Sequence, residues 1–367
     1  MMQRLKGYVQ IWVMACLLAG CSVLDDSLPT EPVMVDLHLA VATAEMAGSA
    51  STRADTDYQL PECIGEQIQT VRIVIVRPTG EVECNRYLNM TQATMQTDYY
   101  RFRVVANETK TVYLFVNENA QRQNYDGQQV KIVNYNFGTI AEGETFPEAV
   151  EKLEVSLSEA YEQLKSGTGK QDVLLPMNER HSVTVTDQEQ QKLLFVTRAA
   201  TKFTYIVTNR SDRPCTLSGI AIDKMARREY YLPQSKISYS YVAVPSGSTD
   251  PDAPYNTLGQ MDLTNYSVPM VGTNEYYTFT QSVDRTIAAG ATVTIDPIYL
   301  LEGKFNSYQT TLTINGVEVT AAFPNLGQLP RNTHVVVKAM IDERNHTWEV
   351  DLFPYIQSDI LAPDFGL

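Results

Sequence analysis

Residues 33–42 read VMVDLHLAVA, and their alternation guides the interpretation of the rest of the sequence. One set of side chains is aliphatic, while the set between them includes Asp36 and His38. This period of two predicts a β-strand of roughly 33 Å with one buried face. The aliphatic set consists of Val33, Val35, Leu37, Leu39 and Val41.

The strand is followed by a segment that we expect to be flexible: residues 47–57 read AGSASTRADTD. Its side chains are small or short, and Arg53 is the only long one among them. Small, accessible and flexible residues are the preferred sites of proteolytic cleavage. We therefore predict that the chain is cut between Arg53 and Ala54, and that the strand upstream is a temporary occupant of its groove.

The first twenty residues have the pattern of an export signal. Arg4 and Lys6 precede the apolar run 8–19, which is too short to span a bilayer as a mature helix. The run ends in Leu18-Ala19-Gly20-Cys21, which resembles the bacterial lipobox, where the cysteine receives lipid such as palmitate and becomes the new N-terminus. An ordinary signal peptide followed by a chance cysteine is the alternative.

Cys16 lies within the signal, so the cysteines that remain beside Cys21 are Cys63, Cys84 and Cys215. A Cys63–Cys84 disulfide is compatible with a location outside the cytoplasm, and plain buried thiols are equally compatible with the sequence. The spacing has no metal-ligand pattern.

Length and charge limit the classes of function. The chain has 367 residues, 44% of them apolar, which suits two domains with their own cores. Its formal net charge of -14 argues against nucleic acid as a partner, because phosphate binding needs a basic surface.

Short strand patterns recur along the chain after Arg53. The dipeptide Asn315-Gly316 lies between TLTI and VEVT and predicts a tight hairpin. A helix is expected only within 146–164. Further strands are expected at 70–76, 99–105, 111–116, 193–207, 237–244, 276–280, 291–295, 333–341 and 347–352.

This pattern predicts an all-β fold with a minor helix, built as two β-sandwich domains in tandem. The expected order is a signal peptide (1–20), a lipid tether with the removable strand (21–53), an N-terminal sandwich (54–195) and a C-terminal sandwich (196–367).

Catalytic motifs are missing from the sequence. His38, His181, His334 and His346 form no HExxH pattern, and no G-x-S-x-G turn occurs. The segment 167–170 (GTGK) lacks the spacing of a phosphate loop. We expect no enzyme, no cofactor and no metal site.

Several pieces together resemble the fimbrillin, or type V pilin, family of Bacteroidia-type fimbrial subunits. They are the lipobox, Thr52-Arg53 after an alternating strand, VTRAATKFTYIVTN at 196–209, Leu175-Pro176-Met177, Tyr231-Leu232-Pro233, Pro330-Arg331-Asn332-Thr333 and Trp348-Glu349-Val350. The resemblance covers nearly the whole chain and implies sandwich domains of the transthyretin-like, Greek-key kind.

The resemblance also implies a mechanism and its partners. Such precursors reach the outer membrane and cell surface as lipoproteins, and an arginine-specific protease cuts them after a residue like Arg53. A C-terminal strand of a neighbouring fimbrial subunit then fills the vacated groove and builds an adhesive fimbrium (pilus) by donor-strand exchange.

The sequence leaves open which segment is donated and which position the subunit takes in the fibre. The candidate donor strand contains Trp348, Val350 and Leu352, whereas 333–341 is expected to close its own domain. A shaft or accessory subunit, an anchor that keeps its lipid, and a tip are alternatives within the family. Outside it, the 21 tyrosines allow a glycan-binding surface lipoprotein.

Overall fold

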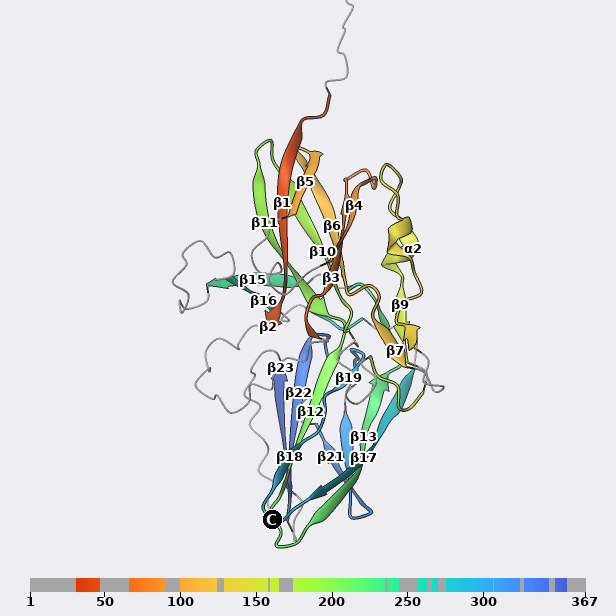
Figure 1. Cartoon of the computed structure of the whole chain (residues 1–367), viewed down its shortest axis with the longest axis vertical. Helices are drawn as coiled ribbons and strands as arrows, with labels where there is room; N and C mark the ends of the chain where they lie inside the picture. Colours follow the sequence, from red (N-terminus) through yellow and green to blue (C-terminus); the bar gives the residue numbers. More distant parts are fainter. Residues whose placement is uncertain are drawn as a thin grey trace, which may run out of the picture.

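The computed structural model describes residues 31–46, 66–89, 100–123, 129–157, 159–164, 174–234, 237–243, 257–262, 266–269, 275–305, 307–323, 327–342 and 347–354. These residues form an all-β structure of two sandwich-like domains arranged along the long axis of the molecule (Figure 1). Among them, no helix is long and apolar enough to cross a membrane.

The first domain is a seven-stranded sheet with the order β4-β3-β6-β10-β11-β1-β5. In this order β1, at the N-terminal end of the described chain, lies between β11 and β5, which are distant from it in sequence. The strands are β1 (Met34–Thr43), β3 (Thr70–Val76), β4 (Val82–Asn89), β5 (Tyr100–Val105), β6 (Glu108–Val116), β10 (Met177–Val185) and β11 (Gln190–Arg198).

This sheet rolls up so that its two edge strands approach each other through side chains. Arg86 of β4 donates from Nη1 to the carbonyl of Arg101 in β5 at 3.0 Å, and its guanidinium lies 4.9 Å from the ring centroid of Phe102. The enclosed core contains aliphatic side chains from β1, β3, β6, β10 and β11. The domain is therefore a rolled sheet whose backbone ladder stays open between β4 and β5.

The second domain packs two sheets face to face. One has the order β18-β12-β22-β23, with β19 also paired to β12, and the other has the order β17-β13-β20-β21. The strands are β12 (Thr201–Asn209), β13 (Cys215–Ala226), β17 (Tyr276–Ile287), β18 (Thr292–Thr294), β19 (Ile298–Leu300), β20 (Gln309–Ile314), β21 (Val317–Ala322), β22 (Thr333–Ile341) and β23 (Thr347–Pro354).

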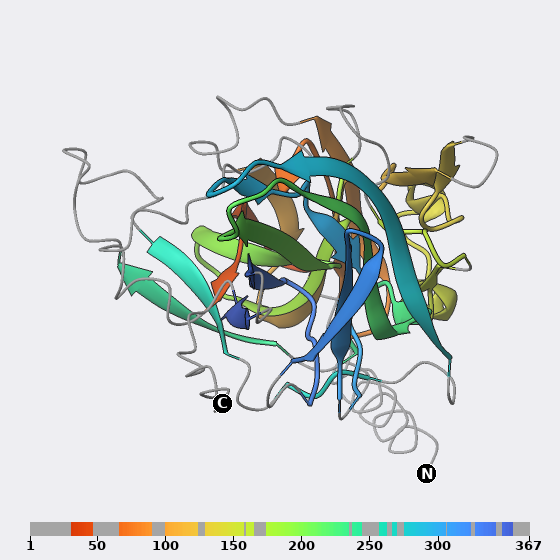
Figure 2. The same ribbon diagram turned by 90° about the horizontal axis from the view of Figure 1, so that it is seen from below.

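Three small sheets complete the structure. They are β9 (Glu154–Ser156) with β14 (Arg228–Tyr230), β7 (Gln121–Gln123) with β8 (Gln129–Lys131), and β2 (Glu45–Met46) with β16 (Thr257–Asp262) and β15 (Ser238–Ala243). The β15–β16 hairpin projects from the side of the molecule in two perpendicular views (Figures 1 and 2).

The helix expected within 146–164 is much shorter in the structure. Helix α2 covers only Glu148–Glu151, and β9 follows at once; a 3-10 turn, η3, covers Phe137–Thr139. Val150 and Leu157 are buried, but they reach the core from a short helix and from an extended segment. Tertiary packing of 153–157 against β14 outweighs the helical spacing.

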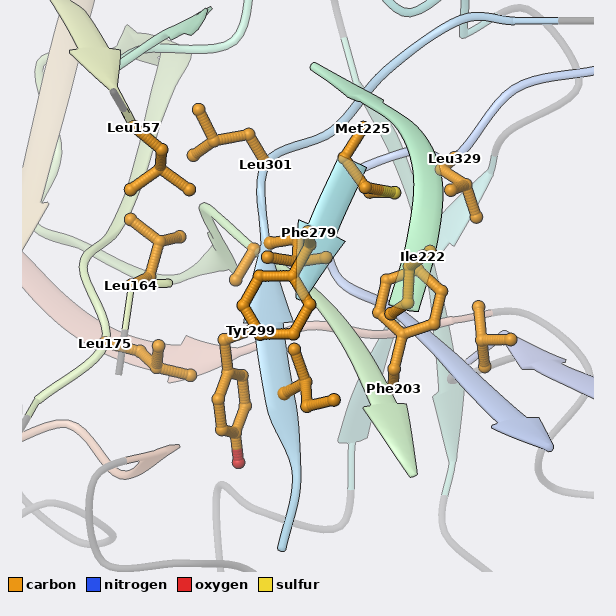
Figure 3. Close-up of a cluster of buried hydrophobic side chains, with 14 of the residues drawn as sticks. Leu157, Leu164, Leu175, Phe203, Ile222, Met225, Phe279, Tyr299, Leu301 and Leu329 are labelled. Atoms are coloured by element: carbon orange, nitrogen blue, oxygen red, sulfur yellow. The ribbon is translucent and has the colours of Figure 1, made fainter. Parts of the chain in front are cut away.

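The larger core joins the two domains. It contains Val74 and Phe115 from the first sheet together with Phe203 and Phe279 from the second domain. Figure 3 shows Leu157, Leu164 and Leu175 pointing into the same cluster as residues of the second domain. The chain passes between the domains after Arg198, where β11 ends and β12 begins at Thr201.

Candidate functional site

Strand β1 occupies an interior position of the first sheet, between β11 and β5 (Figure 1). It runs parallel to β11, with Leu37 opposite Gln190 and Thr43 opposite Val196. It runs antiparallel to β5, with Met34 opposite Val105 and Leu39 opposite Tyr100. The backbone of the N-terminal segment thus completes two ladders at once.

The alternation of β1 separates a buried face from a polar one. Val35, Leu37, Leu39 and Val41 are 7%, 0%, 0% and 3% exposed and belong to the core of the first domain. Val33 differs from the expected pattern because it is 57% exposed; it precedes β1 and lies beyond the paired part of β11. Four of the five predicted side chains therefore fill the groove.

The energy of this burial is large. Each aliphatic side chain contributes roughly 1.5–3 kcal/mol, so the four together contribute roughly 6–12 kcal/mol. A whole domain is stable by only about 5–15 kcal/mol. The first domain therefore depends on having a strand in this groove.

Polar side-chain contacts hold the outer face of β1. Asp36 lies 3.2 Å from Arg101 and 3.6 Å from Arg103, both on β5. His38 lies 3.0 Å from Glu189, just before β11. Since the Arg101, Arg103 and Glu189 side chains are more than half exposed, these pairs add little stability and mainly favour one register.

Strand β5 depends on β1 for its place in the sheet. In the part of the chain that the structure describes, β1 is the only strand that forms a backbone ladder with β5. The connection from β5 to β6 turns at Asn107, whose φ of 59° suits asparagine, but β6 pairs with β3 and β10 instead. Loss of β1 would therefore leave the facing backbone edges of β5 and β11 unpaired.

The far end of β1 contacts the second domain. The Ala44 amide donates to the carbonyl of Val196 at 2.8 Å, and the Ala44 carbonyl accepts from Asn332 Nδ2 at 3.1 Å. Asn332, with a φ of 61°, stands directly before β22. The groove thus ends at the junction of the two domains.

Beside this junction lies a buried charge cluster around Arg331, which is 0% exposed. Its guanidinium lies 2.9 Å from Glu302 and 3.2 Å from Glu229, and it donates to Asn178 Oδ1 of β10 at 3.1 Å. It also donates to the carbonyls of Tyr230 and Tyr231 at 2.6 and 3.0 Å. Arg331 therefore links the first sheet to two other segments, 229–231 and the one that contains Glu302.

One cation faces two buried carboxylates in this cluster. Burial raises the pKa of Glu229 to about 8, although the charge of Arg331 opposes the shift. Burial alone would lower the pKa of Arg331, but the charges of Glu302 and Glu229 outweigh it and raise it. Burial therefore favours the protonated form of Glu229, whereas the neighbouring carboxylates favour the charged form of Arg331.

The C-terminal strands mirror the arrangement around β1. Strand β22 lies parallel to β12, as β1 lies parallel to β11, and it pairs antiparallel with β23. Val335 and Val337 are 0% exposed, which fits the expectation that 333–341 closes its own domain. Among the described strands, β23 lies at the edge of its sheet and pairs with β22 alone.

The candidate donor residues all lie on β23. Trp348 is opposite Ala339, Val350 is opposite Val337, and Leu352 is opposite Val335. In the isolated chain this segment thus extends its own domain, and its donation to another subunit stays a prediction.

Other predicted residues lie outside the described part of the chain. They are Cys21, Arg53, Ala54 and Cys63. Cys84 and Cys215 are free thiols, and burial raises the pKa of Cys84 to about 11, which makes it a poor nucleophile.

The buried histidines have structural contacts. His181 Nε2 lies 2.6 Å from the carbonyl of Phe195, and burial lowers its pKa. His334 Nε2 lies 2.9 Å from Thr204 Oγ1, and burial lowers its pKa to about 3. Among the described residues, no group of three or more His, Cys, Asp or Glu side chains could hold a metal ion.

Sequence reasoning did not identify Arg331 and Asn332 as functional residues. They occur in Pro330-Arg331-Asn332-Thr333, which enters the sequence analysis only as one of the pieces that resemble the fimbrillin family. A buried arginine leaves no periodic signal, because its partners come from distant segments.

Comparisons with known proteins support the fold. No family model and no curated protein sequence matches the chain. The chain is similar to the solved structure of a "putative cell adhesion protein" from Parabacteroides distasonis, with a TM-score of 0.50 and 12% identity over 89% of this chain and 98% of that chain. That likeness shows a shared fold.

Two fimbrial proteins from Porphyromonas gingivalis also match. The tip fimbrial protein Mfa3, with C-terminal truncation, has a TM-score of 0.46 and 12% identity over 87% of this chain and 99% of that chain. The fimbrial anchor protein Mfa2 has a TM-score of 0.40 and 8% identity over 87% of this chain and 96% of that chain. The structural neighbours of the chain are thus cell-adhesion and fimbrial proteins.

Proposed function

We propose that this protein is a structural subunit of a cell-surface fimbrium, in which β1 is a replaceable occupant of the first domain. The observation that carries the proposal is the position of β1. It is an N-terminal segment that fills an interior slot between β11 and β5, with four buried side chains. A segment in that position can be exchanged for a strand of another chain without any change in the remaining sheet.

Cleavage after Arg53 would turn β1 into a separate peptide held only by noncovalent contacts. An empty groove would expose unpaired backbone groups and an apolar surface. An alternating strand from a second chain would pair the backbone groups and cover the apolar surface. Strand β1 would therefore leave the groove only when such a strand replaces it.

Export would follow the lipoprotein route in this proposal. Cys21 would carry the lipid and hold the precursor at the outer membrane until an arginine-specific protease acts. The lipid leaves together with residues 21–53, so a cut subunit is free to join the fibre. An uncut subunit keeps Cys21 and becomes an anchor.

Strand β23 is our proposed donor, because an edge strand with one ladder is the easiest to release. Its departure would leave β22 paired with β12 and buried in the second domain. Trp348, Val350 and Leu352 would then enter the groove that Val35, Leu37 and Leu39 fill in the precursor.

The substitution Arg53→Ala is expected to give a full-length lipoprotein that folds but forms no polymer. The readouts are SDS-resistant ladders and N-terminal sequencing of protein sheared from cells. Arg213→Ala is the matched control, because the Arg213 side chain is 82% exposed in a loop and should not affect assembly. Assembled wild-type protein that begins at Cys21 would contradict cleavage and favour the anchor role.

Deletion of residues 347–367 is expected to give a subunit that folds but cannot extend a fibre. Loss of polymer should be near complete, because the deletion removes the whole proposed donor strand with Trp348, Val350 and Leu352. Deletion of residues 355–367 alone is the control that separates the strand from the tail. Wild-type fibre length after the longer deletion would rule out β23 as the donor.

A further inference from the structure

Asn332 lies between the end of β1 and the start of the β22–β23 hairpin. It is 1% exposed and directly precedes β22, which begins at Thr333. Its φ of 61° lies in the left-handed region, which asparagine adopts more readily than most residues. Its main-chain amide donates to the carbonyl of Ala200, in the link between the two domains, at 2.7 Å. The backbone of Asn332 is therefore held at the domain junction.

The side-chain amide of Asn332 contacts the ends of β1 and β11 together. Its Nδ2 donates to the carbonyl of Ala44 at 3.1 Å, and its Oδ1 accepts from the Arg198 main-chain amide at 3.4 Å and from Arg198 Nη1 at 3.3 Å. Ala44 is 0% exposed, and its own amide donates to the carbonyl of Val196 in β11. The Asn332 donor thus depends on the N-terminal segment, whereas the Asn332 acceptor depends on the rest of the chain.

The start of β22 carries the far end of the proposed donor strand. Thr333 is opposite Pro354, and His334 is opposite Phe353, so the last pairs of β23 follow Asn332 at once. The other end of the hairpin is joined through residues 342–346, which connect β22 to β23. Strands open from their ends, and the release of β23 is therefore expected to begin beside Asn332.

Departure of β1 would take the Ala44 carbonyl away from Asn332. A buried amide donor without an acceptor destabilises the arrangement that holds it, so the side chain must turn or the segment must shift. Arg331 cannot shift easily, because its guanidinium pairs with the buried carboxylates of Glu302 and Glu229. The displacement is therefore expected on the other side of Asn332, at the start of β22.

We propose that Asn332 is a positioning residue that couples the groove of the first domain to the donor hairpin of the second. It holds the far end of β23 while β1 is in place, and it loosens that end when β1 leaves. This coupling rests on the proposed function, in which β1 is replaced and β23 is donated. Its consequence is that a cut subunit with an empty groove releases its donor strand more readily than the uncut precursor does.

The first test is amide hydrogen exchange of the uncut full chain with Asn332→Asp. Aspartate tolerates the same φ and keeps an acceptor for Arg198, but it has no donor for the end of β1. The amides of His334 and Phe353 should exchange about tenfold faster, the usual effect of one lost buried hydrogen bond. Asn315→Asp is the matched control, because Asn315 is exposed, has a φ of 51° and also uses its Oδ1 as an acceptor.

The second test separates coupling from a merely structural role of Asn332. The folded chain is cut after Arg53, and its own segment is displaced by an excess of synthetic peptide 31–44 or 31–43, both with a C-terminal amide. Both peptides bring the same buried side chains, and the terminal amide of the shorter one can still donate to Val196. Only the longer peptide brings the Ala44 carbonyl, so it should slow exchange at the far end of β23 about tenfold relative to the shorter one.

The coupling is overturned if the two peptides give the same exchange at Phe353, or if Asn332→Asp leaves the exchange of His334 and Phe353 unchanged. These readouts come from single subunits in solution. If they are as expected but the protein forms no SDS-resistant ladders on cells, the proposed function fails and the coupling stands.

Discussion

A chain that begins at Ala54 is expected to lose the cooperative fold of its first domain. It lacks β1, so four core side chains and the only ladder of β5 among the described residues are gone. The lost burial of roughly 6–12 kcal/mol is comparable with the stability of a whole domain. Near-UV circular dichroism and amide hydrogen exchange should report a disordered first sheet, with the second domain retained.

A synthetic peptide of residues 31–46 should restore the fold of that chain in trans. The peptide can form the same ladders with β11 and β5, and its addition should return the exchange protection of both strands. A peptide carrying Leu37→Asp is the control, because it would place a charge at a fully buried position. If the chain from Ala54 is fully folded without any peptide, β1 is not an integral part of the sheet.

Replacement of the buried Arg331 is the second change with a large expected effect. Arg331→Met keeps an unbranched side chain but leaves Glu229 and Glu302 without their cation. Removal of one partner from a buried ion pair typically costs about 3–5 kcal/mol. Urea unfolding should show this loss near pH 8. Arg228→Met is the control, since Arg228 is 45% exposed and pairs with Glu275 at 2.8 Å, so it should cost less than about 1 kcal/mol.

The wild-type protein should also lose stability as the pH rises. Burial raises the pKa of Glu229 to about 8 and that of Glu179 to about 7, from an ordinary value of 4.5. A raised carboxyl pKa means that the folded state holds protons that the unfolded state has released. The contribution is therefore complete below about pH 4.5 and declines up to about pH 8.

The Arg331→Met variant should steepen this dependence, because protonation relieves its unpaired carboxylates. Unfolding free energies of both proteins at pH 5 and pH 8 measure the effect. An equal loss at both pH values would show that the missing packing of the side chain, and not the charge, is responsible.

The sequence was sufficient to predict strands and their buried faces. The alternation in 33–42 identified Val35, Leu37, Leu39 and Val41 as core residues, and all four are buried. The hairpin at Asn315-Gly316 is confirmed, since both residues have positive φ values of 51° and 79° between β20 and β21. Local patterns of this kind depend on neighbours in the sequence alone.

Long-range pairing could not be predicted in the same way. The pattern VMVDLHLAVA does not indicate parallel pairing with β11, because the partner of a strand is determined by tertiary packing and by how the chain connects the strands. The spacing within 146–164 indicated a helix, yet pairing with β14 favours an extended segment there. The Arg331 cluster was missed because its members come from β10, β14 and two loops.

The pairing of β1 with β11 also has a consequence for the order of events during folding. Strand β1 can pair with β5 early, but its ladder with β11 cannot form until residues up to Arg198 have been synthesised, so one edge of β1 stays unpaired until then. Contacts of such high sequence separation form slowly, and unpaired edges are then prone to aggregation. The chain is therefore most vulnerable to aggregation in the interval before β1 completes its second ladder.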